Sequence, residues 1–232
     1  MTDNGKNSPL RDRMALALDV DDLVAAVRLG KDLAPWFGVA KVGLELYSAA
    51  GPDSIGMLQD LGYEIFLDIK LHDIPTTVNK SARVLGSIGC KYLTLHAHGG
   101  VDMLRAGVEG LNEGASGAGL EQPMALAVTV LTSDADAPSH IVPNRIRVAV
   151  EGGCAGIVCA AGDVRDAKTL APRLKAVVPG IRPEGADRND QARAATPQEA
   201  LDAGADLLVI GRPVTQAPDP AEAAAALVEG LV

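Results

Sequence analysis

Short runs of aliphatic and β-branched residues recur along the chain about every 25 to 30 residues, and an Ala-rich segment with helical spacing follows each run. This alternation of one strand and one helix is typical of a parallel sheet. Eight such pairs can be counted. The predicted strands are residues 14–20, 39–46, 64–70, 92–97, 124–130, 156–161, 176–181 and 207–211.

The segments between the predicted strands carry residues that begin helices. Aspartate and threonine side chains accept hydrogen bonds from the free amides of a first helical turn, and proline fits that turn because it has no amide hydrogen. We therefore expect helices to begin at these positions. They are Asp21-Asp22, Pro75-Thr76, Asp163, Thr196-Pro197 and Asp219-Pro220.

Eight nearly continuous apolar strands, each followed by a helix, predict an α/β fold of the (β/α)8 TIM-barrel type. A doubly wound open sheet is the alternative, and it usually carries a Gly-rich phosphate loop after its first strand. Residues 18–22, Leu-Asp-Val-Asp-Asp, contain no glycine, which favours the barrel. We predict a flexible N-terminal segment over residues 1–12 and a single catalytic barrel domain over residues 13–232.

Composition excludes some functions. The chain is 47% hydrophobic but only 3% aromatic, so its core must consist mainly of Ala, Val, Leu and Ile. A formal net charge of -9 argues against a nucleic-acid binder, and an anionic ligand would need a local cationic site. The N-terminus is polar and no apolar stretch reaches spanning length, which predicts a cytoplasmic protein without membrane contact.

Charged residues gather at the end of the third predicted strand, where Asp68, Lys70 and Asp73 follow an apolar run. In a regular strand, residues two apart share a face, so Asp68 and Lys70 should point the same way while Ile69 packs on the other side. Carboxylates and an ammonium this close alter one another's proton affinity, which predicts an acid–base site. The alternative is a solvated ion pair on an edge strand.

Lys41 on the second predicted strand extends this group, because barrels place their active sites at the carboxyl ends of the strands. Together with Asp68, Lys70 and Asp73 it would form a chain of alternating charges that fixes geometry and protonation state together. A lysine held by carboxylates stays cationic, which suits a proton donor or carbanion stabiliser better than a Schiff-base nucleophile. Asp19, at the end of the first strand, could bind a sugar hydroxyl.

Two arginines follow the last two predicted strands. Arg182 and Arg212 occupy the position where barrels commonly bind phosphate, and a guanidinium matches the oxygens of a phosphate. Gly211 would let a ligand approach the backbone closely. These residues predict a phosphorylated substrate. The alternative is that Arg212 pairs with a helix carboxylate while Arg182 faces solvent.

Histidines near the fourth strand raise the alternative of a metal site. His96 and His98 share a face of that strand, and Asp19 or Asp68 could complete the ligand set. A hydrogen-bonded histidine near the barrel interior is the commoner arrangement, and we favour it here. For His72, both a structural role and a role as a base stay open.

Residues 68–77, Asp-Ile-Lys-Leu-His-Asp-Ile-Pro-Thr-Thr, resemble the signature of the orotidine 5′-monophosphate decarboxylase family. The resemblance extends over roughly residues 13–232, and it is specific because this motif occurs in order with the later Gly-Ile-Arg-Pro and Gly-Arg motifs. Further matching segments lie on both sides of residues 68–77. They are Leu18-Asp19, Ala40-Lys41-Val42-Gly43, residues 128–133, residues 179–183, Asp190-Gln191 and Ile210-Gly211-Arg212-Pro213.

The resemblance implies removal of CO2 from orotidine 5′-monophosphate to give uridine 5′-monophosphate, the last step of pyrimidine synthesis, with no metal and no organic cofactor. It implies that Lys70 protonates C6 of the pyrimidine, while Asp68 and Asp73 flank the reacting carboxylate. Asp73 and Thr77 are expected to reach into the neighbouring site of a homodimer. The implied substrate-binding residues are Asp19 and Lys41 at the ribose, Thr132 at the pyrimidine edge, and Arg182, Gln191, Gly211 and Arg212 at the phosphate and its closing loop.

Two alternatives to this activity stay open. Related barrels such as 3-keto-gulonate-phosphate decarboxylase and hexulose-phosphate synthase share Asp-x-Lys-x-x-Asp but use a magnesium ion. Residues 74–77, Ile-Pro-Thr-Thr, and Gln191 favour the orotidine enzyme. The other alternative is a barrel that binds a nucleotide without catalysis, and the complete set of acid–base residues argues against it.

Overall fold

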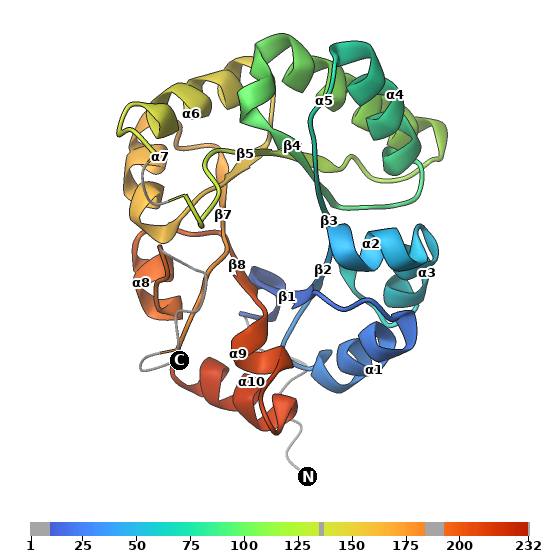
Figure 1. Ribbon diagram of the computed structural model, residues 1–232, viewed down its shortest axis with the longest axis vertical. Coiled ribbons are helices and arrows are strands. Elements are labelled where there is room, and N and C mark those ends of the chain that lie inside the picture. Colours follow the sequence, from blue (N-terminus) through green and yellow to red (C-terminus); the bar gives the residue numbers. More distant parts are fainter. Residues whose placement is uncertain (1–9, 135–136, 184–192, 232) are drawn as a thin grey trace.

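Eight parallel strands close into a barrel, which confirms the fold predicted from the hydrophobic pattern. The structure, a computed structural model, describes residues 10–134, 137–183 and 193–231. Each strand pairs with the next along the chain, and β8 closes the barrel against β1 (Figure 1). The strands are β1 (Met14–Leu18), β2 (Val39–Gly43), β3 (Glu64–Leu71), β4 (Tyr92–His96), β5 (Met124–Val128), β6 (Gly156–Val158), β7 (Lys175–Val178) and β8 (Leu207–Ile210).

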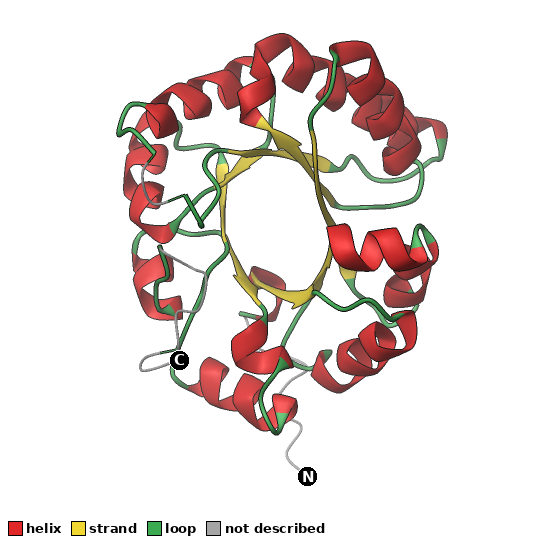
Figure 2. Ribbon diagram, viewed as in Figure 1, coloured by secondary structure: helices red, strands yellow, loops and turns green. Residues whose placement is uncertain are grey.

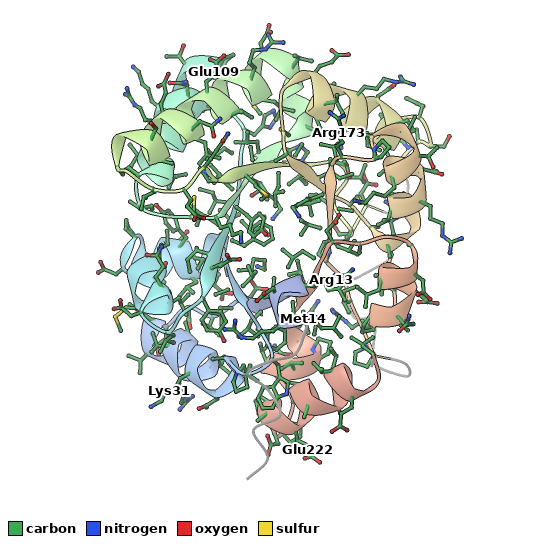
Figure 3. All side chains as sticks on the ribbon, turned by 180° about the vertical axis from the view of Figure 1, so that it is seen from behind. Arg13, Met14, Lys31, Glu109, Arg173 and Glu222 are labelled. Atoms are coloured by element: carbon green, nitrogen blue, oxygen red, sulfur yellow. The ribbon has the colours of Figure 1, made fainter. Side chains whose placement is uncertain are left out.

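Helices form a ring around the strands (Figure 2). Charged side chains such as Lys31, Glu109 and Glu222 lie on the outer side of this ring (Figure 3). The α-helices are α1 (Leu23–Leu33), α2 (Leu44–Ala50), α3 (Asp53–Gln59), α4 (Pro75–Gly86), α5 (Gly100–Gly117), α6 (Ile141–Glu151), α7 (Val164–Leu170), α8 (Pro197–Asp202), α9 (Arg212–Thr215) and α10 (Pro220–Glu229). Short 3-10 helices are η1 (Arg11–Arg13), η2 (Ala97–Gly99) and η3 (Ala161–Asp163).

The apolar residues form two layers because alternate strand residues face opposite sides of the sheet. The larger layer lies between the strands and the helices and consists mostly of Leu, Ile, Val and Ala. Inside the barrel, the rings of Phe66 and Tyr92 pack edge to face with their centroids 5.9 Å apart. The inner layer comprises Ala15, Ala17, Val39, Phe66, Tyr92, Leu126, Val177, Leu207 and Val209.

Several helices begin where the sequence predicts. The side chain of Asp22 accepts hydrogen bonds from the amides of Val24 and Ala25 at the start of α1. Thr196 forms a capping box with Glu199 at the start of α8. These side chains satisfy amides that have no partner within the helix, which fixes the point at which each connecting loop becomes helical.

Helices α4 and α5 pack closely because α5 presents glycines to its neighbour. A Cβ atom at Gly110 would lie 2.1 Å from the carbonyl oxygen of Asn79, and one at Gly114 would lie 1.9 Å from that of Arg83. Only a residue without a side chain fits at such distances. The close contact holds α4, whose first turn contains the last residues of the motif at 68–77, against α5, which in turn contacts β4 and β5.

Most strands end earlier than predicted, and this corrects the sequence-based boundaries. The second strand was expected to reach residue 46, but helix α2 begins at Leu44, so Glu45 lies on a helix. Val130, Ala160 and Ile181 stay buried beyond the ends of their strands. The apolar run continues because the residues remain inside the protein, and burial alone does not distinguish a paired strand from the loop that follows it.

Part of the predicted N-terminal segment is bound to the barrel. Arg11 donates from Nε to the carbonyl oxygen of Ala34 over 2.9 Å, and Gly38 N donates to the carbonyl oxygen of Arg11 over 2.8 Å. Residues 1–9 lie outside the described part of the chain, so the boundary at residue 12 stays a prediction. No helix among the described residues is long and apolar enough to cross a membrane.

Candidate active site

A cavity of about 670 Å³ opens among residues at and beyond the carboxyl ends of the strands, the end at which barrels carry their active sites. Its described lining contains four basic side chains, Lys41, Lys70, Arg182 and Arg212, against three acidic ones. The local charge therefore suits an anion although the whole chain carries -9. The remaining lining is partly apolar, with Phe66, Val128, Val130, Val158 and Val209 among its members.

Four charged side chains, Asp19, Lys41, Asp68 and Lys70, lie in a row in this cavity, which we call the charge chain. They come from the first three strands and the residues just after them. Lys41 Nζ lies 2.7 Å from Asp19 Oδ1 and 4.0 Å from Asp68 Oδ2. Lys70 Nζ donates a hydrogen bond of 2.8 Å to the other oxygen, Asp68 Oδ1. Carboxylates and ammoniums thus alternate along the chain, which is the charge pattern expected from the sequence.

One member of the predicted charge chain is different. Asp73 was expected beside Lys41, Asp68 and Lys70, but in the described structure Asp19 takes the terminal position. The carboxylate of Asp73 is exposed and accepts a hydrogen bond of 2.6 Å from the amide of Ile74, so it is turned toward the start of α4. Neither Asp73 nor Thr77 lines the cavity of its own chain.

Strand register explains how the chain of charges fits. Gly43 is paired with Asp68 on β3, while Leu18, the residue before Asp19, is paired with the residue before Gly43. A Cβ atom at Gly43 would lie 3.0 Å from both Asp19 Oδ1 and Lys41 Nζ. A side chain at this position would press on the ion pair, so the glycine leaves room for it. Lys41 is only 7% exposed, and water screens its charge weakly.

The strand that carries Asp68 and Lys70 is irregular, which corrects the simple alternation predicted for it. The register between β3 and β4 shifts between Leu67 and Leu71, and Lys70 has a φ of 50°. Both side chains nevertheless converge, because the Lys70 ammonium bends back to Asp68. The hydroxyl of Thr94 on β4 accepts a hydrogen bond from Lys70 N over 2.8 Å and lies 3.1 Å from Asp68 Oδ1.

The residues predicted at the phosphate lie at the cavity. Arg182 lines it, is 7% exposed, and donates from Nη1 to the carbonyl oxygen of Ile181 over 2.9 Å, so the alternative that it faces solvent is wrong. Gly211, between β8 and α9, and Arg212, the first residue of α9, also line it. Thr132 lines it after β5. Gln191 lies outside the described residues, and its role stays a prediction.

Three histidines, His72, His96 and His98, lie together next to Lys70 but do not line the cavity. The ring of His72 has its centroid 5.6 Å from each of the other two. Burial, together with the charge of Arg145 and the neighbouring histidines, lowers the pKa of His96 to about 4. Its Nδ1 accepts a hydrogen bond from His98 N over 3.2 Å, which supports the structural role favoured for it. In the described part of the chain, no group of three or more His, Cys, Asp or Glu is arranged to hold a metal ion.

The chain matches a known family along almost its whole length. The family model described as "Orotidine 5'-phosphate decarboxylase / HUMPS family" matches residues 12–227. The chain belongs to this family. The resemblance drawn from residues 68–77 and the motifs that follow is thereby confirmed.

Individual members of the decarboxylase family are similar over nearly the full chain. An orotidine 5′-phosphate decarboxylase of Anaeromyxobacter dehalogenans is 45% identical over 95% of this chain and 98% of its own length. One of Moorella thermoacetica is 42% identical over 94% of this chain and 91% of its own length. The crystal structure of the orotidine 5′-phosphate decarboxylase of Lactobacillus acidophilus is 35% identical, covers 94% of this chain and 98% of that chain, and superposes with a TM-score of 0.78.

Two residues that contact the charged side chains at the cavity escaped the sequence-based prediction. Thr94 was treated as an ordinary strand residue, although it is a hydroxyl residue within the otherwise apolar run Tyr92–Leu95 and shares the inward face with Tyr92. That pattern was the available signal. Gly43 appeared in a motif, but its function of leaving room for Asp19 and Lys41 follows only from the register of the strands.

Proposed function

We propose that the chain decarboxylates orotidine 5′-monophosphate to uridine 5′-monophosphate, without a metal or an organic cofactor. The observation that carries the proposal is the ammonium of Lys70, held 2.8 Å from Asp68 in a cavity that also contains two arginines suited to a phosphate. The names of relatives that are 39–45% identical support the same activity. These relatives do not favour the metal-dependent sugar-phosphate enzymes or a non-catalytic nucleotide-binding barrel.

In the proposed reaction the bond between C6 of the pyrimidine and the carboxylate carbon breaks. CO2 leaves, and the electron pair of the bond stays on C6. Lys70 Nζ then transfers a proton to C6, which gives the product, and the neutral amine regains a proton from solvent. An ammonium fixed beside C6 stabilises the negative charge as it develops, so no reorganisation is needed during the reaction. The hydrogen bond to Asp68 Oδ1 fixes the direction of the ammonium.

The proposed substrate extends across the cavity in three parts. Asp19 and Lys41, joined at 2.7 Å, are suited to the ribose hydroxyls because the pair offers both an acceptor and a donor. Arg182 and Arg212 are suited to the phosphate. Further residues of the proposed site are Thr132 at the pyrimidine edge, Gly211 beside the phosphate, and Gln191 on the loop expected to close over it.

Binding of the phosphate can accelerate a reaction that takes place far from it. Contacts to a remote group contribute to the rate when they are used to order the site and expel water in the transition state. Arg182 is already buried and bonded to the backbone, so it forms a fixed point for an anion. A nucleotide with this charge does not cross membranes unaided, which supports a cytoplasmic location as part of the proposal.

The proposal includes a homodimer in which Asp73 and Thr77 serve the partner's site. Both residues are exposed and neither lines the cavity of its own chain, which is the arrangement expected if they act elsewhere. Ile74, between them, is 65% exposed, and burial in a subunit interface would remove this apolar surface from water. These observations support the cross-subunit role inferred from the family resemblance.

The activity is tested by following the ultraviolet absorbance of orotidine 5′-monophosphate with excess EDTA present. We expect turnover by the wild type, and we expect Lys70→Ala to lower it at least about thousandfold because the charge and the proton donor are both lost. Lys31→Ala, on the outer side of α1, is the control and should leave turnover unchanged. A wild type that is inactive in EDTA, or a Lys70→Ala variant as active as wild type, would overturn the proposal.

The shared site has a separate test, in which the inactive variants Lys70→Ala and Asp73→Ala are mixed and allowed to exchange subunits. A hybrid dimer contains one site with both residues intact, so random exchange should restore about a quarter of the wild-type activity. Sedimentation of the wild type measures whether it is a dimer. A mixture no more active than its separate components would show that each site uses its own Asp73.

A further inference from the structure

The backbone of Lys70 has an unusual conformation that the proposed chemistry does not by itself explain. Among the described residues, Lys70 is the one residue other than glycine with a positive φ, at 50°. A side chain on such a backbone is strained, so surrounding contacts must hold the conformation in place. The strain occurs at the residue proposed to donate the proton. It coincides with the register shift between β3 and β4.

The contact that holds this conformation comes from Thr94. Its hydroxyl accepts a hydrogen bond of 2.8 Å from Lys70 N and donates one of 3.1 Å to Asp68 Oδ1. A hydroxyl has one hydrogen to donate, and here that hydrogen goes to the carboxylate while a lone pair receives the amide. Thr94 is fully buried, so water does not replace either bond.

Both bonds act on the position of the Lys70 ammonium. Asp68 Oδ1 accepts from Thr94 Oγ1 and from Lys70 Nζ, so the same oxygen is fixed from two sides. The amide of Lys70 is fixed at the other end of the same residue. Thr94 therefore closes a ring that runs from the Lys70 backbone through the hydroxyl and the carboxylate to the Lys70 ammonium.

We propose that Thr94 is a positioning residue, whose hydroxyl holds the strained backbone of Lys70 and the carboxylate of Asp68 in the geometry that aims the ammonium at the substrate. The inference rests on the proposed decarboxylation. Thr94 does not line the cavity and has no direct contact with the substrate in this scheme. Its loss should therefore lower kcat with little effect on KM or on binding of uridine 5′-monophosphate.

The test compares Thr94→Val, which keeps the shape but removes the hydroxyl, with Thr94→Ser, which keeps the hydroxyl. We expect Thr94→Val to lower kcat about 30-fold, since buried hydrogen bonds to a charged group are lost, while KM changes less than about threefold. Thr94→Ser should stay within about threefold of wild type. Thr129→Val is the matched control, because Thr129 is equally buried and its hydroxyl donates to Val158 O and not to the site.

A structural role alone predicts a different result. Thr94→Val and Thr129→Val would then lose similar stability in thermal denaturation, and neither would lower kcat selectively. An unchanged kcat in Thr94→Val, or a Thr94→Ser variant as slow as Thr94→Val, would overturn the inference. If Thr94→Val does not fold, Thr94→Ala is compared with Thr94→Ser in the same way, and a fold that tolerates neither Val nor Ala would also overturn it.

A second measurement separates this inference from the proposed function. Hydrogen exchange of the Lys70 amide should become at least about tenfold faster in Thr94→Val and stay unchanged in Thr129→Val, because the amide loses its acceptor only in the first variant. This readout does not need a substrate. If the wild type is inactive but the exchange pattern is as expected, the proposed decarboxylation is wrong and the contact of Thr94 with Lys70 still holds the backbone. If exchange of the Lys70 amide is unchanged in Thr94→Val, that role of Thr94 is wrong.

Discussion

Lysine–aspartate ion pairs lie at both ends of the barrel, with similar distances between nitrogen and oxygen but with different neighbours. At the amino end, Lys168 Nζ lies 2.6 Å from Asp206 Oδ2 and also donates to the carbonyl oxygen of Leu174 over 2.9 Å. The same aspartate oxygen accepts a hydrogen bond of 2.7 Å from Ala176 N at the start of β7. At the carboxyl end, Lys41 and Lys70 bind only aspartates among the described residues.

The difference lies in the hydrogen-bond partners. The pair at the amino end also bonds to the backbone, and we call it the closed group. The lysines at the carboxyl end bond only to aspartates among the described residues, and we call them and their aspartates the open group. Lys168 and Asp206 tie the loops before β7 and β8 to the barrel, and each of them also forms a hydrogen bond with the backbone. Lys70 Nζ has one hydrogen-bond partner in the described structure and three hydrogens to donate. An open group beside a cavity can bind a ligand, whereas a closed one serves stability. The residue types alone do not distinguish the two cases.

The largest effect expected from this comparison comes from Lys41→Met, which removes the ammonium but keeps the aliphatic stem. Asp19 and Asp68 would then face each other across the site without the cation between them. We expect kcat/KM for orotidine 5′-monophosphate to fall about a thousandfold, because a weakly screened charge is lost from the site. Steady-state kinetics measure the effect, and circular dichroism checks the fold. A loss below about tenfold would mean that the charge chain does not need Lys41.

The same substitution at the other end, Lys168→Met, should have the opposite profile. We expect the free energy of unfolding to fall by about 1 to 2 kcal/mol, because Asp206 and the carbonyl oxygen of Leu174 lose their charged donor. Turnover should remain within about twofold of wild type, since the pair lies at the opposite end of the strands. Urea denaturation gives the stability. A large loss of turnover with normal stability would show that the closed group also serves the site.

The sequence predicted the barrel, and it predicted most of the charged residues that line the cavity, for a physical reason. Charged residues inside apolar strands cost free energy unless they are paired, so Lys41 between Ala40 and Val42 indicates a site and not a surface. The order of polar residues at successive strand ends then follows from the closed barrel. Arg182 and Arg212 were found in this way.

The remaining features depend on distances that a linear pattern does not contain. That Asp19 and not Asp73 ends the charge chain follows from the register of β1 and β2 and from the turn after β3. The left-handed backbone conformation at Lys70 could not be predicted, because this position is not glycine or asparagine, the residues that usually adopt it. The strand ends were placed too late because apolar residues such as Val130 stay buried at the cavity. Gln191 is still known from the motif alone.

A smaller effect is expected from His96, the last residue of β4, whose ring lies beside those of His72 and His98. Burial, with the charge of Arg145 and the neighbouring histidines, lowers its pKa from 6.5 to about 4. Between these values the unfolded chain binds more protons than the folded one, so the free energy of unfolding falls as the pH falls from 6.5 toward 4. His96→Asn keeps an acceptor for His98 N but does not titrate. Its unfolding midpoint should therefore depend less on pH in this range than that of wild type.

Thermal denaturation of both proteins across the range measures this difference. Other groups titrate in the same interval, so the informative quantity is the midpoint of the variant minus that of wild type at each pH. This difference should be lowest above pH 6.5 and should rise as the pH falls, because only wild type loses stability through His96. A difference that stays constant with pH would show that His96 does not resist protonation in the folded chain.

The smallest effect is expected at the ion pair between Glu64 and Lys91, which joins the first residue of β3 to the residue before β4. It lies at the amino end like Lys168 and Asp206, but both side chains are more than a third exposed. Glu64→Gln should therefore change the free energy of unfolding by no more than about 0.5 kcal/mol, and the change should vanish in about 1 M salt because water and ions screen an exposed pair. Urea denaturation at low and high salt gives both values. If Glu64→Gln lowers the free energy of unfolding as much as Lys168→Met, exposure does not explain the difference in stability between the two ion pairs. The backbone hydrogen bonds of Lys168 and Asp206 would then not be the reason that this pair stabilises the fold.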